Sequence, residues 1–175
     1  LRARQMVEEG RLGTVIGFRA EYLHSGNVPE GRPLAWKDMK EFGGGVLYDL
    51  GSHVLDLLAW LCDDAPAEIA ARRRILHPKR PSRADPTRLV EQDGDDQTVM
   101  LITLRSGAIG TLEASKIATG AQDELHLEIR GTKGALRYSL MDPNYLEWFD
   151  ISDPETPLGG TSGFKRIHCV QRSEE

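Results

Sequence analysis

Apolar and polar residues alternate most regularly in the second half of the chain. From residue 124 to 130, the apolar side chains Leu125, Leu127 and Ile129 fall on one face of an extended chain, and charged or polar residues fall on the other. This alternation predicts a strand with one buried face. Other runs rich in β-branched, aromatic and apolar residues predict further strands over residues 14–24, 68–76, 99–104, 109–117, 135–140 and 145–149.

Helical spacing characterises two segments of the first half. Six apolar residues recur at the spacing of one helix face, which predicts a helix from the glycine run 43–45 to about Cys62. A shorter helix over residues 1–9 is predicted to end at Gly10. The glycine- and proline-rich segment 25–41 is expected to be a long functional loop, and the polar segment 77–93 a second loop.

The connections between strands predict the fold class. Short turns at Ser106-Gly107 and at residues 131–134 favour antiparallel pairing, because parallel strands need long crossovers. With one layer of helices, the pattern predicts a single α+β domain over residues 1–175. The segment 99–104 is apolar on both faces, so its sheet needs a second cover besides the helices. The chain starts without methionine inside a predicted helix, which suggests a fragment of a longer protein.

Composition narrows the classes of function. Hydrophobic residues make up 39% and charged residues 28%, as in a globular domain, and the formal net charge of −5 argues against nucleic-acid binding. No apolar stretch approaches the ~20 residues that a membrane-spanning helix needs, and the first residues lack the apolar core of a signal peptide. Two cysteines outside any CxxC pattern argue against a disulfide framework. We therefore expect a cytoplasmic protein that binds neither nucleic acid nor membrane.

The strongest candidate for chemistry is a carboxylate and an imidazole on the predicted helix that ends at about Cys62. Asp49 and His53 are four residues apart, so they share one helix face, where the carboxylate would orient the imidazole and raise its basicity for general-base catalysis. A surface pair or a hydrogen-bonded core network would have the same spacing. Asp56 lies near the same stripe and suggests a metal site, but no second cluster of ligands completes a shell, so no metal is expected.

The sequence around these residues carries a more specific signal. The stretch Gly43-Gly-Gly-Val-Leu-Tyr-Asp49-Leu-Gly-Ser-His53-Val-Leu-Asp56 resembles the helix signature of the Gfo/Idh/MocA family, named after glucose–fructose oxidoreductase, inositol dehydrogenase and a rhizopine-catabolism protein. Further segments that resemble the family are residues 10–16, 36–37, 110–116 and 129–136. The resemblance thus covers most of residues 1–168.

The resemblance implies a fold and a cofactor. It implies a C-terminal domain with a large, mostly antiparallel open sheet and helices on one face, which the family joins to a Rossmann domain. No Gly-x-Gly-x-x-Gly fingerprint follows a strand, so the Rossmann domain is absent and NAD or NADP would be bound mainly elsewhere. Gly44 and Gly45 leave the helix start open to close approach and are assigned to cofactor contact. We expect closing helices beyond Glu175, and a homodimer or homotetramer through the sheet face.

The resemblance also implies roles for single residues. His53 matches the histidine that exchanges the proton of the reacting hydroxyl, and Asp49 matches the aspartate that orients it and holds a substrate hydroxyl. Trp36 and Lys37 would bind substrate, although relatives usually have arginine in place of the lysine. The family's catalytic lysine belongs to the first domain and has no counterpart here, so the chain alone is expected to be inactive.

The implied function is that of a substrate-binding and oligomerisation domain of an NAD(P)-dependent oxidoreductase. Its substrate would be a small sugar, polyol or inositol-like molecule, oxidised at a secondary hydroxyl. A non-catalytic assembly or binding module with the same fold is the alternative, and the presence of both Asp49 and His53 favours the enzyme. A metal hydrolase is a more distant alternative.

Two further features have simpler interpretations. Arg72, Arg73, Arg74, Lys79, Arg80 and Arg83 form a basic run, but acidic residues follow directly, so a solvated strand and loop is expected rather than an anion site. His24 precedes the long loop and could touch substrate, although a structural or exposed role is favoured. The residues from His24 to Pro29 depart from the family's aromatic pattern and leave the choice of substrate open.

Overall fold

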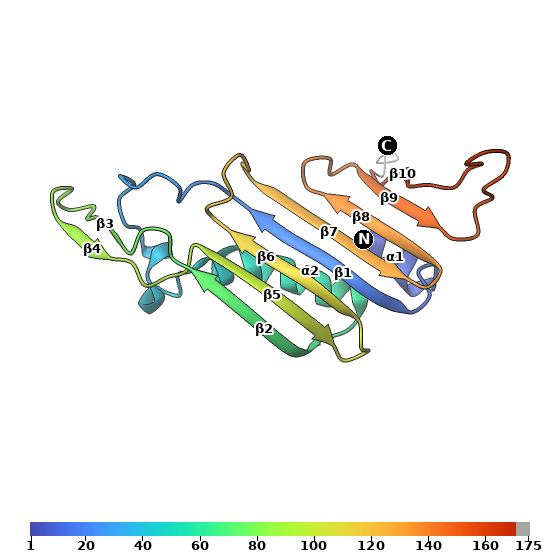
Figure 1. Cartoon of the computed structure of the whole chain (residues 1–175), viewed down its shortest axis with the longest axis horizontal. Helices are drawn as coiled ribbons and strands as arrows, with labels where there is room; N and C mark the ends of the chain where they lie inside the picture. The colour runs from blue at the N-terminus through green and yellow to red at the C-terminus, as the bar shows by residue number, and fades with distance from the viewer. Residues whose placement is uncertain (171–175) are drawn as a thin grey trace, which may run out of the picture.

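The computed structural model describes residues 1–170 and contains one eight-stranded sheet and one two-stranded sheet (Figure 1). The strands of the large sheet are β1 (Val15–Leu23), β2 (Pro66–Arg74), β5 (Gln97–Leu104), β6 (Ile109–Ser115), β7 (Glu124–Gly131), β8 (Gly134–Ser139), β9 (Tyr145–Asp150) and β10 (Lys165–His168). The small sheet pairs β3 (Lys79–Pro81) with β4 (Leu89–Glu91). The helical segments are α1 (Arg2–Glu8), η1 (Trp36–Asp38), η2 (Lys40–Phe42), η3 (Leu47–Gly51) and α2 (Ser52–Cys62).

The strand order of the large sheet is β10-β9-β8-β7-β1-β6-β5-β2. All neighbours pair antiparallel except β1 and β6, which run parallel with Gly17 opposite Ile109 and Leu23 opposite Ser115. The predicted fold class, an α+β domain with a large, mostly antiparallel open sheet, is therefore confirmed. Because β1 and β6 are parallel, their carboxyl ends meet at the same edge of the sheet.

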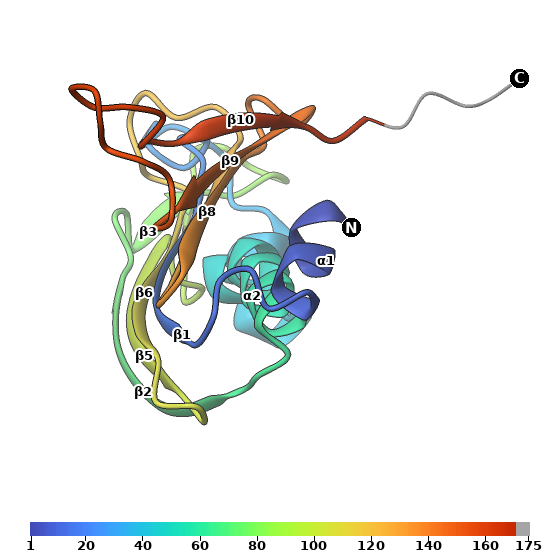
Figure 2. The same cartoon turned by 90° about the vertical axis from the view of Figure 1, so that its right-hand side faces the viewer.

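Both α-helices lie against the same face of the sheet (Figure 2). The buried stripe of α2, formed by Val54, Leu58 and Leu61, packs in one apolar cluster with inward-facing strand residues such as Ile102 and Leu112. The alternation predicted for residues 124–130 is confirmed, since Leu125, Leu127 and Ile129 are all buried. Burial of these apolar side chains removes their surface from water and fixes the helices on the sheet.

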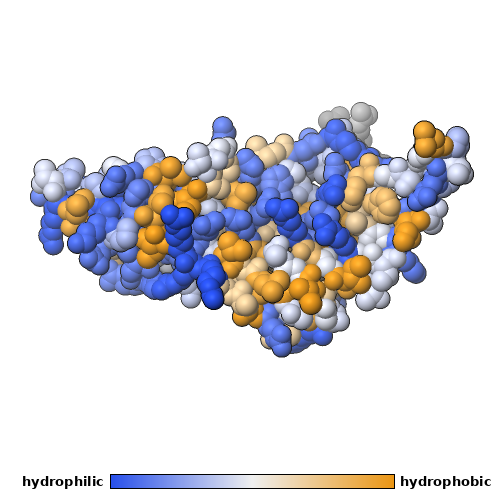
Figure 3. Space-filling view, viewed as in Figure 1, coloured by the Kyte–Doolittle hydropathy of each residue, from blue (hydrophilic) through white to orange (hydrophobic). Residues whose placement is uncertain are grey.

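The opposite face of the sheet is open, and it carries apolar surface beside a strongly hydrophilic band (Figure 3). Val99, Leu101 and Ile109 are 40%, 53% and 55% exposed on strands β5 and β6. The inward-facing neighbours on β5 are buried, so residues 99–104 carry apolar side chains on both faces, as predicted. On β6 the outward face is mixed, because Thr111 and Glu113 follow Ile109 there. Within residues 1–170, no helix is long and apolar enough to cross a membrane.

Some elements differ from the sequence-based prediction. The helix expected from residue 43 to Cys62 is α-helical only from Ser52, because residues 47–51 form the wider π-helical turn η3. Gly51 permits this turn to lie close to β6, since a Cβ there would stand 3.0 Å from the Leu47 side chain and 3.4 Å from Ala114. The predicted loop 77–93 contains the hairpin β3–β4, and β10 is an additional strand.

Candidate functional site

The candidate site lies where the parallel strands β1 and β6 end. Side chains alternate between the two faces of a strand, and the even-numbered residues of β6, and of β1 from Phe18 onward, face the helices. Tyr22 therefore lies on the helix side at the end of β1, and Lys116 is a buried residue directly after β6. The turn η3 contributes Asp49, and the first turn of α2 contributes His53.

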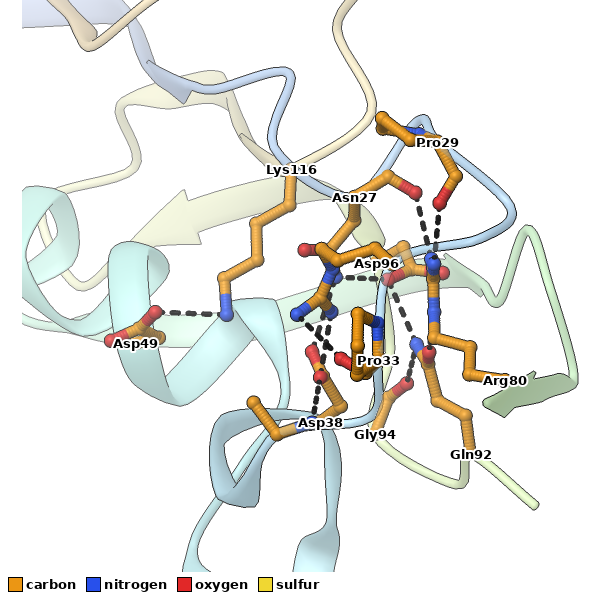
Figure 4. Close-up of polar contacts among 12 residues, drawn as sticks. Asn27, Pro29, Pro33, Asp38, Asp49, Arg80, Gln92, Gly94, Asp96 and Lys116 are labelled. Carbon is orange, nitrogen blue, oxygen red and sulfur yellow. Dashed lines mark hydrogen bonds and ion pairs between the residues drawn. The ribbon is translucent and has the colours of Figure 1, made fainter. Parts of the chain in front are cut away.

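Asp49 is bound by two lysines. Its Oδ1 lies 2.7 Å from Nζ of Lys37, and its Oδ2 lies 2.8 Å from Nζ of Lys116. Figure 4 shows the ammonium group of Lys116 pointing at the carboxylate from the strand side. Burial opposes ionisation of Asp49, but hydrogen bonds from Lys116 and Lys37 and their charges outweigh it, so the pKa of Asp49 lies below the usual aspartate value. Asp49 is thus an ionised acceptor at neutral pH.

His53 is exposed and lies beside the ring of Tyr22, with 6.4 Å between ring centroids and an interplanar angle of 57°. Burial raises the pKa of Tyr22, and a hydrogen bond and charge from Asp123, with the charge of Asp49, raise it further. Tyr22 is therefore a neutral phenol that lies beside the imidazole of His53 and near the carboxylates of Asp49 and Asp123. This arrangement brings an imidazole, a phenol and an ionised carboxylate to one place.

The carboxylate of Asp49 and the imidazole of His53 share no contact within the described residues. Among the contacts of residues 1–170, the carboxylate oxygens of Asp49 are paired with lysines and not with the imidazole. The π-helical turn changes the angle per residue, so the four-residue spacing no longer has the α-helical geometry on which the prediction depended. Orientation of His53 by Asp49 stays a prediction.

Trp36 and Lys37 lie on the short turn η1, which Asp38 stabilises. A carboxylate oxygen of buried Asp38 accepts the N–H of Ala35 at 2.8 Å. Trp36 is 57% exposed. Nζ of Lys37, which contacts Asp49, lies 5.6 Å from the centroid of the Trp36 ring. The structure thus brings Lys37 to the site and leaves Trp36 exposed beside it.

Gly44 and Gly45 are buried and pack against the same turn. Their N–H groups donate to the carbonyls of Met39 and Lys37, each at 2.9 Å. A Cβ at Gly44 would stand 2.6 Å from the carbonyl oxygens of Lys37 and Met39, so only glycine fits there. Their small size therefore serves packing of the loop, and their contact with a cofactor stays a prediction.

A buried polar network holds the loop that leads from β1 to η1 (Figure 4). Arg80 is completely buried and donates to the carbonyls of Asn27 and Pro29 and to the side chain of Gln92. The prediction that the basic run is solvated is therefore wrong for Arg80. It is confirmed for Arg72, Arg73 and Arg74, which are exposed. A glycine- and proline-rich loop leaves carbonyls without partners, and a buried guanidinium supplies the missing donors.

The amide of Asn27 continues this network by donating to Asp96 at 2.6 Å and to Asp38 at 3.2 Å. Asp38 also accepts from Arg32 at 2.6 Å. The network thus connects the hairpin β3–β4, the loop after β1 and the turn that carries Lys37.

The remaining candidates have structural contacts. Nδ1 of His24 accepts the N–H of Gly26 at 2.7 Å, which fits the structural role favoured for this residue. Asp56 is exposed on α2. Residues 1–170 contain no group of three histidine, cysteine, aspartate or glutamate side chains that could hold a metal.

Three residues of the site were not predicted from the sequence, namely Tyr22, Lys116 and Asp123. Tyr22 lies two residues after buried Ala20, and Lys116 lies four residues after buried Leu112. An even separation along a strand places two side chains on the same face. This parity could have placed them on the helix side. The parallel pairing that brings them together joins segments about ninety residues apart, which local patterns do not reveal.

Comparisons with known proteins identify the family of the chain. A family model described as GFO/IDH/MocA C-terminal domain matches residues 1–137. Levoglucosan dehydrogenase of Pseudarthrobacter phenanthrenivorans is 30% identical over 149 residues, which cover 78% of this chain and 38% of that protein.

Two solved structures show the same fold. An oxidoreductase domain protein from Kribbella flavida has a TM-score of 0.86 and 36% identity, and the match covers 95% of this chain and 43% of that one. Levoglucosan dehydrogenase in complex with NADH and levoglucosan has a TM-score of 0.85 and 28% identity, with the same coverages of 95% and 43%. The chain thus spans about two-fifths of the length of these relatives.

Proposed function

The chain belongs to the Gfo/Idh/MocA family, and we propose that it is the substrate-binding domain of an NAD- or NADP-dependent oxidoreductase. The proposed substrate is a sugar, polyol or inositol-like molecule that is oxidised at a secondary hydroxyl. The observation that carries this proposal is an ionised Asp49 held by two lysines beside the exposed imidazole of His53. The relative that binds NADH and levoglucosan supports the same class of chemistry.

In the proposed reaction, His53 accepts the proton of the reacting hydroxyl as the carbinol carbon loses a hydride. The bound nicotinamide supplies the hydride acceptor, so the alcohol becomes a ketone and two electrons pass to the cofactor. Asp49 accepts a hydrogen bond from a substrate hydroxyl, and its lowered pKa keeps it in the acceptor form at neutral pH. Exposed Trp36 offers an apolar ring for a sugar face, and Lys37 offers a donor beside it.

The residues of this chain fit the substrate better than the phosphates of a dinucleotide. The N–H groups of Gly44 and Gly45 are used by carbonyls of the chain, so they cannot cradle a pyrophosphate in this conformation. We therefore place the binding of NAD or NADP mainly on a nucleotide-binding domain outside these 175 residues. On this proposal the chain alone has no dehydrogenase activity.

We also propose that the open sheet face is where copies of the chain assemble into a homodimer or homotetramer. Val99, Leu101 and Ile109 expose apolar surface that water covers poorly, and a second sheet would bury it. Light scattering coupled to size exclusion tests this for the wild type and for Leu101→Glu. Assembly should be lost in the variant, and a wild-type monomer at all concentrations would contradict the proposal.

A substrate screen tests the catalytic proposal directly. The protein that joins this chain to a nucleotide-binding domain is incubated with NAD or NADP and a panel of sugars, polyols, anhydrosugars and inositols. We expect reduced nicotinamide to form with at least one of them, detected by its absorbance. A correctly folded protein that binds the cofactor but oxidises no member of the panel would favour the non-catalytic assembly module.

A further inference from the structure

Lys116 is a buried cation at the site for which the catalytic signature gives no role. Its side chain is only 9% exposed. Within the described part of the chain, its ammonium group has one carboxylate partner, Asp49, with 2.8 Å between Nζ and Oδ2. A lysine ammonium has three N–H donors, so two remain for a ligand.

The balance of donors and acceptors around Asp49 points in the same direction. Lys37 and Lys116 share one carboxylate, so the N–H donors of the two ammonium groups outnumber its oxygen atoms. A buried ammonium loses hydration and needs hydrogen-bond acceptors in return. A ligand oxygen placed beside this ion pair, within reach of both groups, would supply such an acceptor.

We propose that Lys116 determines specificity by donating a hydrogen bond to a hydroxyl oxygen of the substrate whose own proton is donated to Asp49. This inference rests on the proposed function, and it narrows the substrate class to neutral polyols. A hydroxyl is both a donor and an acceptor, so a neighbouring carboxylate and ammonium recognise it together. An ionised carboxylate has no proton to donate to Asp49, so a sugar acid would place two hydrogen-bond acceptors against each other and would fit less well.

The test measures binding rather than turnover, in the protein that includes the nucleotide-binding domain. The protein is loaded with reduced nicotinamide so that an alcohol binds without being oxidised. The probes are myo-inositol, D-glucose, their monodeoxy analogues and gluconate, measured by calorimetry. The variants are Lys116→Met and Lys116→Gln, with Lys79→Met as the matched control, because Lys79 is 62% exposed on the small hairpin and pairs only loosely with Glu91.

We expect Lys116→Met and Lys116→Gln to bind the preferred polyol roughly 10- to 100-fold more weakly, the usual value of a hydrogen bond from a charged donor. Lys79→Met should bind like the wild type. For the deoxy analogue that lacks the contacted hydroxyl, the wild type and the Lys116 variants should bind equally. The melting temperature of each variant confirms that it is folded.

Three results would overturn the inference. The first is wild-type affinity for the polyol in both Lys116 variants. The second is that the Lys116 variants bind every deoxy analogue more weakly than the wild type does, by the same factor. The third is a wild type that binds no polyol or prefers gluconate. Failure of the proposed function is a separate outcome. Polyol binding that depends on Lys116, without hydride transfer in the substrate screen, would retain the role of Lys116 and contradict the dehydrogenase.

Discussion

The ion pairs of Asp49 predict an asymmetric effect on stability. Asp49→Asn removes the charge that faces Lys116, whose side chain is 9% exposed, whereas Lys116→Met leaves Asp49 paired with Lys37 and 21% exposed. Loss of one partner from a buried pair costs about 3–5 kcal/mol, and the partial exposure of Asp49 reduces this to roughly 2–3 kcal/mol. Exposed ion pairs are worth about 0–1 kcal/mol. Lys37 is 49% exposed, so Lys37→Met should cost no more than about 1 kcal/mol.

Urea denaturation of the purified chain measures these differences. The double variant Asp49→Asn/Lys116→Met should recover most of the stability that Asp49→Asn loses, because no buried charge remains unpaired. The effect also depends on pH. The folded pKa of Asp49 is lowered, so its contribution is complete above the unfolded value of about 3.9 and is lost as pH falls through the folded value. This reasoning would be refuted if Asp49→Asn and the wild type had the same free energy of unfolding at neutral pH. It would also be refuted if the double variant were less stable than both single variants.

Three further predictions concern other parts of the chain. Gly44→Ala should lower the free energy of unfolding by roughly 2–4 kcal/mol more than the control Gly31→Ala, because a Cβ would collide with backbone at Gly44 and meets open space at Gly31, and equal effects in urea denaturation would contradict this. Cys62 should react slowly with iodoacetamide at about pH 8, because burial and then the charge of Asp64 raise its pKa to about 11, and rapid labelling seen by mass spectrometry would contradict this. Leu58→Ala should cost about 2–5 kcal/mol, since Leu58 is completely buried, and a loss below about 1 kcal/mol in urea denaturation would show that the core is looser than described.

The strands were predictable because their signal is local. The alternation of residues 124–130 reflects one buried face, and the turn at Ser106-Gly107 joins β5 to β6 as expected. The π-helical turn η3 was not predictable in this way, because apolar spacing was interpreted with an α-helical period. The hairpin β3–β4 was missed because the residue that buries most deeply there is Arg80, a residue type that a hydropathy pattern assigns to the surface.

The candidate site was predictable only in part. Asp49 and His53 are close in sequence and belong to a specific signature, so a local pattern identified them. Tyr22 and Lys116 come from β1 and β6, whose parallel pairing is a long-range feature of the sheet. Their side chains are ordinary in sequence and become candidates only when the strand ends are brought together. The lysine partners of Asp49 could not be inferred from spacing for the same reason.

The central claim is that His53 accepts the proton of the reacting hydroxyl. The decisive measurement is steady-state kinetics of His53→Gln in the protein that includes the nucleotide-binding domain, with the best substrate of the screen. The proposed role predicts a kcat lower by roughly 10²–10⁴-fold, with cofactor affinity and melting temperature close to those of the wild type. A kcat within about 2-fold of the wild type would contradict the claim and would assign proton transfer to another residue.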